Sequence, residues 1–292
     1  MDMKRAYVPQ ETASVKDQLV LLWRSRVLVL SVTLAFGVAA TVVAFLTPKQ
    51  YEATTVLAPV ANAASGGQMG GLGSMASQFG GLAALAGIAM PGESSKAESV
   101  AVLESESLTE SYVQKNDLLP VLFAQYWDPA HKIWTTHDPK HLPTLWKANK
   151  KFDKDVRKVT SAPKTGLVTL TITWTDPKLA SQWANGLVQM TNAYLRDKAI
   201  RESESNIEYL NAEAARTNVV EVKQAIYSIL KTEINREMIA RGSSEYAFKI
   251  IDPATPPELA SFPRKALWLL GGLAFGFILS VLVVFARESF RN

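Results

Sequence analysis

The sequence predicts an α+β protein: a membrane-proximal mixed α/β domain with a long protruding helix, anchored by two transmembrane helices. Three observations lead to this fold class. A charge-free apolar run lies near each end of the chain, and an alternating strand pattern occurs between the two runs. The third observation is the run from 177 to 240, which contains a single glycine and, after Pro177, no proline.

The apolar run nearer the C-terminus extends over 266–286. Its 21 residues carry no charge, and a helix of this length crosses a hydrocarbon core of ~30 Å. Arg264 and Lys265 precede it, and Arg287 and Arg291 follow it. A buried helix of a soluble protein is the alternative, but such a helix rarely stays apolar on every face for this length. The run is therefore predicted to span a membrane, leaving a cytoplasmic tail at 287–292.

The apolar run nearer the N-terminus extends over 27–46 and also lacks charge. A cleaved signal peptide is the competing interpretation, but the run is long and no small-residue cleavage site follows it. The arm 1–26 before it is basic, and short basic segments stay in the cytoplasm. Residues 47–265 are therefore expected on the opposite side of the inner membrane, in the periplasm.

Three strands are predicted within 47–265, at 51–58, 166–175 and 246–251. The second is the clearest, because apolar and polar residues alternate along it. Its core-facing set is predicted to be Val168, Leu170, Ile172 and Trp174. Helices are expected over 95–116 and 144–156, with a short helix starting within 117–128.

The run 177–240 is predicted to be helical, with Asp176 as its N-cap and Pro177 in its first turn. If straight, its 64 residues would span ~96 Å. Thr217–Asn218 is a candidate break. The helix must protrude, bend into a hairpin or pack between subunits.

Residues 65–92 are rich in glycine, alanine, serine and methionine. No phosphate-binding pattern follows the glycines. A flexible linker and a docking element, indicated by apolar residues every three or four positions, remain equally open.

Several kinds of site are not expected. The chain has no cysteine, which excludes disulfides and thiolate metal sites. His131, His137 and His141 are interpreted as surface histidines rather than metal ligands. Glu104 and Glu106 are two residues apart on a predicted helix and point to different faces, which argues against a glycosidase pair. We therefore predict no catalytic residue, metal or cofactor.

Two groups of residues carry a resemblance to a known family. A proline-rich lead, a basic residue and a glycine-bearing terminal membrane helix resemble the end of the Wzz family of polysaccharide co-polymerases; these residues are Pro253, Pro256, Pro257, Pro263, Lys265, Gly271, Gly272 and Gly276. The stretch after the first span resembles the same family at Pro48, Tyr51 and Ala53. The stretches NDLLPVLFAQYWD and WTDPKLASQWANGLV extend the resemblance over nearly the whole chain. The part between the long helix and the last strand is shorter than in many members.

The resemblance implies a non-enzymatic inner-membrane protein that regulates the chain length of a lipid-linked surface polysaccharide, with lipopolysaccharide O-antigen as the first candidate. It implies a homo-oligomeric ring whose partners are a membrane polysaccharide polymerase, the lipid-linked glycan and membrane lipids, with no nucleic acid. An export adaptor for capsule or exopolysaccharide is the alternative within the superfamily. Some relatives carry a fused tyrosine kinase, which is not expected here because six residues follow Ala286. A two-span channel or sensor is the alternative from another class.

Two packing hypotheses follow. Gly272 and Gly276 form a GxxxG pattern, which lets helices approach closely, and we expect the second span to pack against copies of itself. The proline lead is expected to fix how the periplasmic domain joins its membrane helix, because proline restricts the backbone.

Overall fold

The computed structural model describes residues 23, 25–60, 91–136, 138 and 140–289. The expectations for residues 65–90, for His137 and for most of the arm 1–26 lie outside the described residues. The chain forms two compact units. The anchor unit comprises 1–50 and 260–292, and the larger unit comprises 51–259. Mixed helix and strand, long helices and two apolar helices confirm the predicted fold class.

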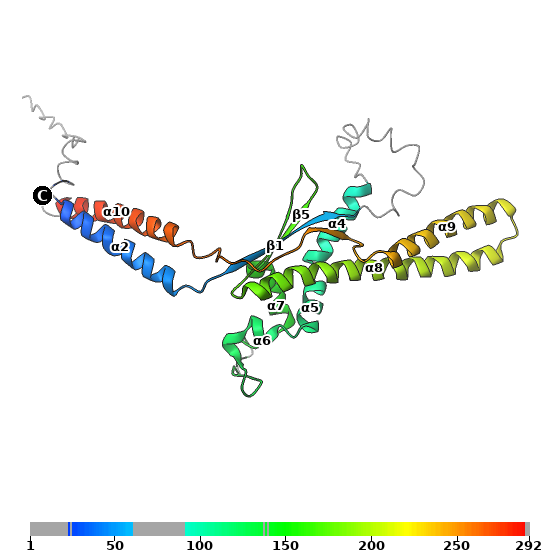
Figure 1. The fold of residues 1–292 in the computed structure, drawn as a ribbon, viewed down its shortest axis with the longest axis horizontal. Helices are drawn as coiled ribbons and strands as arrows, with labels where there is room; N and C mark the ends of the chain where they lie inside the picture. Colours follow the sequence, from blue (N-terminus) through cyan, green and yellow to red (C-terminus); the bar gives the residue numbers. More distant parts are fainter. Residues whose placement is uncertain (1–22, 24, 61–90, 137, 139, 290–292) are drawn as a thin grey trace, which may run out of the picture. The chain divides into compact units, whose positions relative to one another are not determined.

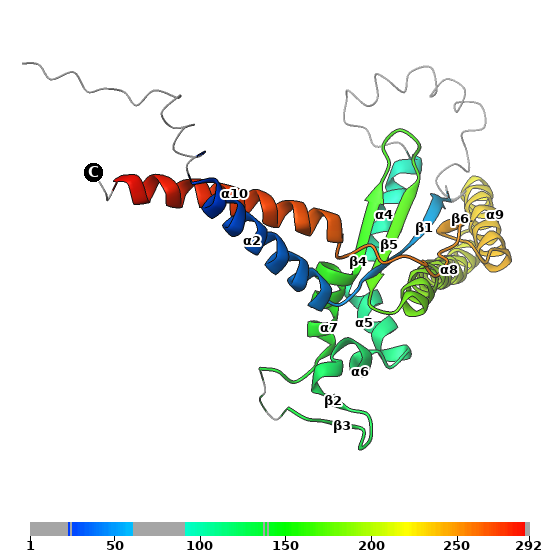
Figure 2. The ribbon, with the colours of Figure 1, turned by 60° about the vertical axis from the view of Figure 1, so that its left-hand side comes forward.

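The larger unit is built on an antiparallel four-stranded sheet of order β4-β5-β1-β6. Its strands are β1 (Tyr51–Pro59), β4 (Arg157–Ser161), β5 (Val168–Trp174) and β6 (Phe248–Asp252). On β5, Val168, Leu170 and Ile172 are fully buried, as the alternation predicted, whereas Trp174 is half-buried. Figure 2 shows β4, β5, β1 and β6 side by side.

Strand β4 was not predicted. The helix expected over 144–156 is α7 (Leu145–Lys151), followed by a π-helical turn (Phe152–Val156), and β4 begins at the next residue. From the sequence alone, the lysines and arginines of 147–164 indicate a solvated helix face. The structure instead buries Arg157, whose guanidinium donates to the backbone oxygens of Leu103 and Glu104 at 2.9 and 2.8 Å.

The helix expected over 95–116 is divided in two. It forms α4 (Pro91–Glu104) and α5 (Glu106–Lys115), with Ser105 between them as the N-cap of α5. Arg157 occupies the C-terminal end of α4, where carbonyl groups lack helical partners. Beyond α5 follow α6 (Leu119–Leu122), a 3₁₀ turn (Ala124–Tyr126) and the small hairpin of β2 (Trp127–Asp128) and β3 (Ile133–Trp134).

The run 177–240 is two helices rather than one. Asp176 caps α8 (Pro177–Arg216) by accepting from the backbone nitrogens of Lys178 and Leu179, as predicted. The chain leaves the helical path at Thr217 and returns as α9 (Val220–Gly242). The two helices lie side by side and extend beyond the sheet (Figure 1). Of the three open alternatives, the chain adopts the hairpin, which brings β6 back to pair with β1.

The core of the larger unit lies between the sheet and the first half of α8. Trp183 of α8 packs between Phe152 and Trp174, with ring centroids 5.6 and 4.9 Å away. Leu187 and Val188 of the same helix are fully buried. This packing fixes one end of α8 on the sheet.

The anchor unit contains α2 (Arg26–Leu46) and α10 (Lys265–Ser289). Both helices are long and apolar enough to cross a membrane, and most of their surface is exposed. The two segments adjoining them pair at a bridge between Gln50 and Phe262, where the Gln50 nitrogen donates to the Phe262 oxygen at 2.9 Å.

Candidate functional site

The glycines of α10 form the contact surface with α2 of the same chain. A Cβ atom at Gly272 would clash with the Cβ of Ala40 and lie 2.9 Å from the Phe36 oxygen. At Gly276 it would lie 2.8 Å from the Phe36 Cβ and 3.0 Å from the Thr33 Cα. In this single chain, the GxxxG face contacts α2. The expected packing of α10 against copies of itself stays a prediction. Small side chains permit this close approach of two helices, whether the partner helix belongs to the same chain or to a copy.

Two other residues that carry the family resemblance, Gly271 and Lys265, lie on the same helix as this contact. A Cβ at Gly271 would meet no described atom within 4 Å, so Gly271 takes no part in the pairing. On α2, a Cβ at Gly37 would lie 2.7 Å from Leu273, so both helices contribute a glycine. The ammonium of Lys265 lies 4.1 Å from the ring centre of Phe45, a favourable cation–π distance.

The returning segment of the larger unit is held by two asparagines of α8. The side-chain oxygen of Asn192 accepts from the nitrogens of Ala247 and Phe248 at 2.9 and 2.8 Å, and its amide donates to the Phe248 oxygen at 2.9 Å. Seven residues earlier, Asn185 bonds both the nitrogen and the oxygen of Ala254, at 3.0 and 2.9 Å. These asparagines replace the backbone partners that a neighbouring strand would supply.

The predicted motif residues are divided between the two units. Pro253, Pro256 and Pro257 follow β6 in the larger unit, and Pro253 directly precedes the residue held by Asn185. Pro263 lies in the anchor unit together with Pro48, Lys265 and the glycines of α10. Tyr51 and Ala53 begin β1, where they pair with Trp174 and Ile172.

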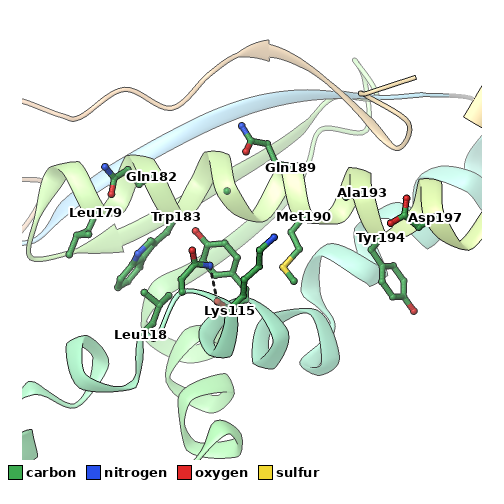
Figure 3. Close-up of a pocket in the computed structure, with 13 residues that line it drawn as sticks. Lys115, Leu118, Leu179, Gln182, Trp183, Gln189, Met190, Ala193, Tyr194 and Asp197 are labelled. Atoms are coloured by element: carbon green, nitrogen blue, oxygen red, sulfur yellow. Dashed lines mark hydrogen bonds between the residues drawn. The ribbon is translucent and has the colours of Figure 1, made fainter. Parts of the chain in front are cut away.

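A groove lies between α5 and α8 of the larger unit, with a volume of about 770 Å³. Figure 3 shows Trp183 and Met190 extending from α8 toward Lys115 and Leu118, while Gln182 and Gln189 lie along the other edge of α8. Tyr194 and Asp197 lie at one end of the groove. The lining combines apolar, aromatic and amide groups, which is typical of ligand-binding sites.

Tyr112 of α5 lies beside this groove with its hydroxyl against Gly186 of α8. Only 6% of Tyr112 is exposed, and its hydroxyl has no hydrogen-bond partner among the described residues. A Cβ at Gly186 would clash with that hydroxyl, so a glycine is required for the close approach. Burial raises the pKa of the Tyr112 phenol to about 12. The hydroxyl is therefore protonated at physiological pH.

The histidines form separate local contacts. Nδ1 of His131 lies 2.6 Å from Asp128, and Nδ1 of His141 lies 2.9 Å from Asp138. These hydrogen bonds help to lower the pKa of both aspartates. Among the described residues, no three histidine or acidic groups gather as metal ligands.

Two family models each match a part of the chain. Residues 12–116 match the family model described as Wzz, chain length determinant protein. The Wzz resemblance is confirmed. Residues 216–289 match a second model, GNVR, described as a G-rich domain on putative tyrosine kinase. In the structure, the Wzz match includes α2, β1 and α5, and the GNVR match includes α9, β6 and α10.

Two solved structures are similar to the chain. One is a full-length bacterial polysaccharide co-polymerase, 12% identical, covering 96% of this chain and 99% of its own, with a TM-score of 0.44. Another is a fragment of WzzB, a polysaccharide co-polymerase from Salmonella Typhimurium, 11% identical, covering 74% of this chain and 100% of its own, with a TM-score of 0.32. With these TM-scores, neither structure carries an argument about this chain. No curated protein sequence matches the chain.

Sequence reasoning missed Asn185, Asn192, Tyr112 and Gly186. The asparagines had a detectable signal, because they are seven residues apart and therefore lie on one face of a long helix. Asparagine at such positions needs a partner when it is buried. Tyr112 and Gly186 had no comparable signal, since their contact depends on how α5 lies against α8.

Proposed function

We propose that this Wzz-family chain regulates the length of a lipid-linked surface polysaccharide and does so without catalysis. The Wzz match over 12–116 carries the proposal. We further propose that the polysaccharide is the O-antigen of lipopolysaccharide, and that the chain acts on a polymerase in the inner membrane. Two apolar helices of membrane-spanning length support an integral membrane location.

Disruption of the gene and complementation test this function. Surface polysaccharide from the disrupted strain, separated on a gel, should lose its preferred length, and the wild-type gene should restore it. An unchanged length distribution contradicts the proposal. If polymer instead accumulates inside the cell and disappears from the surface, the export-adaptor alternative is correct.

We propose that both termini are cytoplasmic and that 47–265 lies in the periplasm. The absence of cysteine from the sequence permits a direct test. Cysteines are introduced at Ser161 and, separately, at Ser289. An impermeant thiol reagent should label position 161 in intact spheroplasts and leave position 289 unlabelled until the membrane is opened. The reverse pattern excludes this topology.

We propose a homo-oligomeric ring as the working form. Residues of α9 leave a large apolar surface outside the α8 contact, which supports association; they include Val220, Tyr227, Ile229, Ile234 and Met238. Many weak contacts on repeated subunits would act together on a long glycan. Mass measurement of the full chain in detergent should give a multimer, and a monomer excludes the ring. A steady ion conductance in planar bilayers would instead favour the channel alternative.

We propose that the proline lead restricts how the larger unit joins its membrane helix. Glycine at positions 256 and 257 would restore backbone freedom that proline removes. The double variant Pro256→Gly with Pro257→Gly should broaden the polymer length distribution while its expression stays at the wild-type level. If the distribution is unchanged, these prolines only end the segment after β6.

A further inference from the structure

The chain enters and leaves the sheet of the larger unit at the same end. Strand β1 begins at Tyr51, which pairs with Trp174 at the end of β5. Strand β6 is antiparallel to β1 and ends beside it, with Asp252 opposite Val56. Four residues separate Tyr51 from Leu46, the last residue of α2. A membrane that α2 crosses is therefore tethered to this end of the sheet by a very short segment.

An extension of the larger unit is attached at this same end. It comprises the described residues of 119–151, from α6 through the β2–β3 hairpin to α7 (Figure 2). The ammonium of Lys151 in α7 lies 5.3 Å from the ring centre of Phe123 and 5.5 Å from that of Trp174. Because Trp174 pairs with Tyr51, the extension is attached beside the point where the chain arrives from α2.

Contacts within the extension join its hairpin, loop and helix. The ring of Tyr126, at the base of the hairpin, lies 5.8 Å from that of His141 in the loop that follows. Lys147 of α7 donates to the backbone oxygens of Lys140 and Leu142 in the same loop, both at 2.7 Å. The three parts therefore form one connected structure.

The surface of the extension combines apolar side chains with positive charge. Over 119–151 the sequence has five lysines and two aspartates, and each aspartate is hydrogen-bonded to a histidine. The large apolar side chains that are between 41 and 56% exposed are Ile133, Leu142 and Trp146. The exposed lysines that form no ion pair with a described residue are Lys132, Lys140 and Lys150.

This combination matches a layer of anionic phospholipid headgroups. Tryptophan is enriched at membrane–water interfaces, and lysines near a negatively charged bilayer surface are attracted to it. The ammonium of Lys150 lies 4.0 Å from the ring centre of Trp146, so a cation and an exposed ring belong to the same patch. An acidic glycan would match the lysines but leave Ile133 and Leu142 in water, whereas a bilayer accommodates both kinds of side chain.

We propose that the extension lies on the membrane surface and binds anionic phospholipid, with its exposed lysines at the phosphates and Trp146 at the boundary with the acyl chains. The proposal rests on membrane anchoring by α2 and α10, and it does not depend on which polysaccharide is regulated. A third attachment, besides the two helices, would restrict how far the larger unit can tilt on its short connections.

Fluorescence quenching of the full-length protein in lipid vesicles tests this contact. Ala130→Cys, at the exposed turn of the β2–β3 hairpin, introduces a single cysteine for an environment-sensitive fluorophore. Lipids with a nitroxide on the headgroup quench the fluorophore when it reaches the bilayer surface. Quenching should be at least twice as strong in vesicles that contain phosphatidylglycerol as in vesicles of phosphatidylcholine alone. A fluorophore at Ser161, at the opposite end of the sheet, should be quenched weakly and equally in both.

Charge variants identify the residues responsible. The extension variant combines Lys132→Gln, Lys140→Gln and Lys150→Gln, and it should lose most of the quenching that depends on phosphatidylglycerol. The matched control removes the same charge from exposed lysines elsewhere and should behave as the parent; it combines Lys164→Gln, Lys231→Gln and Lys249→Gln. Ile133→Ser changes an exposed apolar residue and should also reduce quenching at position 130, with Tm unchanged.

Three results would overturn the proposal. The first is equal quenching at position 130 in neutral and anionic vesicles, and the second is equal quenching in the two triple variants. The third is a response of the fluorophore to dextran sulfate in detergent without quenching by anionic vesicles, which assigns the surface to an acidic glycan.

Failure of the membrane contact is distinguishable from failure of the proposed function. A protein that floats with the vesicles but shows no quenching at position 130 retains its anchors and lacks the contact. A protein that does not float with them lacks membrane anchoring, and the contact fails with it. Length regulation is decided independently by disruption of the gene.

Discussion

The α2–α10 pair and the α8–α9 pair are both antiparallel, yet they are held together by different means. In the anchor unit, backbone meets backbone at Gly272 and Gly276. In the larger unit, Glu202 pairs with Arg236 at 3.0 Å, and Arg241 pairs with Glu204 and Glu237. Close backbone packing dominates the first contact, as it does in helix pairs within a membrane, where lipid offers little hydrophobic drive for pairing. In the second contact, ion pairs complement an apolar seam.

The largest effect on helix pairing is expected at the α2–α10 contact, which depends on close backbone packing. Gly272→Leu with Gly276→Leu places two side chains where a single carbon already clashes, and overpacking costs about 1–3 kcal/mol per site. Cysteines introduced at Phe36 and Phe275, whose side chains meet across the contact, should be joined within one chain by a short bifunctional thiol reagent in the parent and several-fold less in the double variant.

The control for this prediction is Gly271→Leu, because that position faces open space among the described residues. It should crosslink like the parent. Crosslinked dimers in the parent, in place of the intrachain product, would show that α10 pairs between copies, as the sequence suggests.

A second prediction concerns the asparagines at the base of the hairpin. Asn192→Leu deprives three buried backbone groups of their partner, and each unpaired group costs about 1–3 kcal/mol. Thermal unfolding should begin several degrees lower. Asn185→Leu, at a half-buried position with two such bonds, should lower Tm less. Equal Tm values for all three proteins would mean that β6 is held by the sheet alone.

A third prediction concerns high pH. Burial raises the pKa of Tyr112 to about 12, above the usual value near 10, so the folded state holds this proton more tightly than the unfolded state does. Its contribution to stability is complete below pH 10 and declines from pH 10 to pH 12. The difference in absorbance at 295 nm between wild type and Tyr112→Phe should therefore titrate near pH 12. A difference that titrates near pH 10 indicates an accessible hydroxyl.

The smallest effect on stability is expected for the ion pairs of Arg241 in the α8–α9 hairpin. Both of its acidic partners raise the pKa of Arg241, with the hydrogen bond to Glu237 as the largest cause. The group is nevertheless exposed, and exposed ion pairs contribute little. Arg241→Gln should leave Tm unchanged within error at low and at high salt. A marked loss at low salt would show that the hairpin depends on charge more than its exposure indicates.

The parts of the fold that were predictable depend on local sequence. Residues adjacent in sequence were enough to recognise three features: the alternation along β5, the start of the long helix at Asp176–Pro177, and the two apolar runs. The break at Thr217 was recognised as a candidate, but the pairing of α9 with α8 depends on residues more than thirty positions apart. Strand β4 could not be predicted from the charge pattern, because its first residue, Arg157, is buried and donates to backbone oxygens at the end of α4.

The candidate site was less predictable. The GxxxG spacing correctly indicated a close helix contact, but spacing does not identify the partner. The close approach of Tyr112 to Gly186 depends on how α5 packs against α8, which no local pattern indicates. Contacts between elements distant in sequence thus account for most of what the sequence did not provide.

The α8–α9 hairpin is an element whose length can differ among related proteins while its base stays the same. Asn185 and Asn192 fix the base of α8 to the chain that follows α9, whereas the far end turns at Thr217–Val219 and returns. Seven residues added to each arm would lengthen it by about 10 Å and leave the sheet and its register unchanged. Height is thus an adjustable dimension of this architecture, and paired insertions or deletions can alter it without redesigning the base.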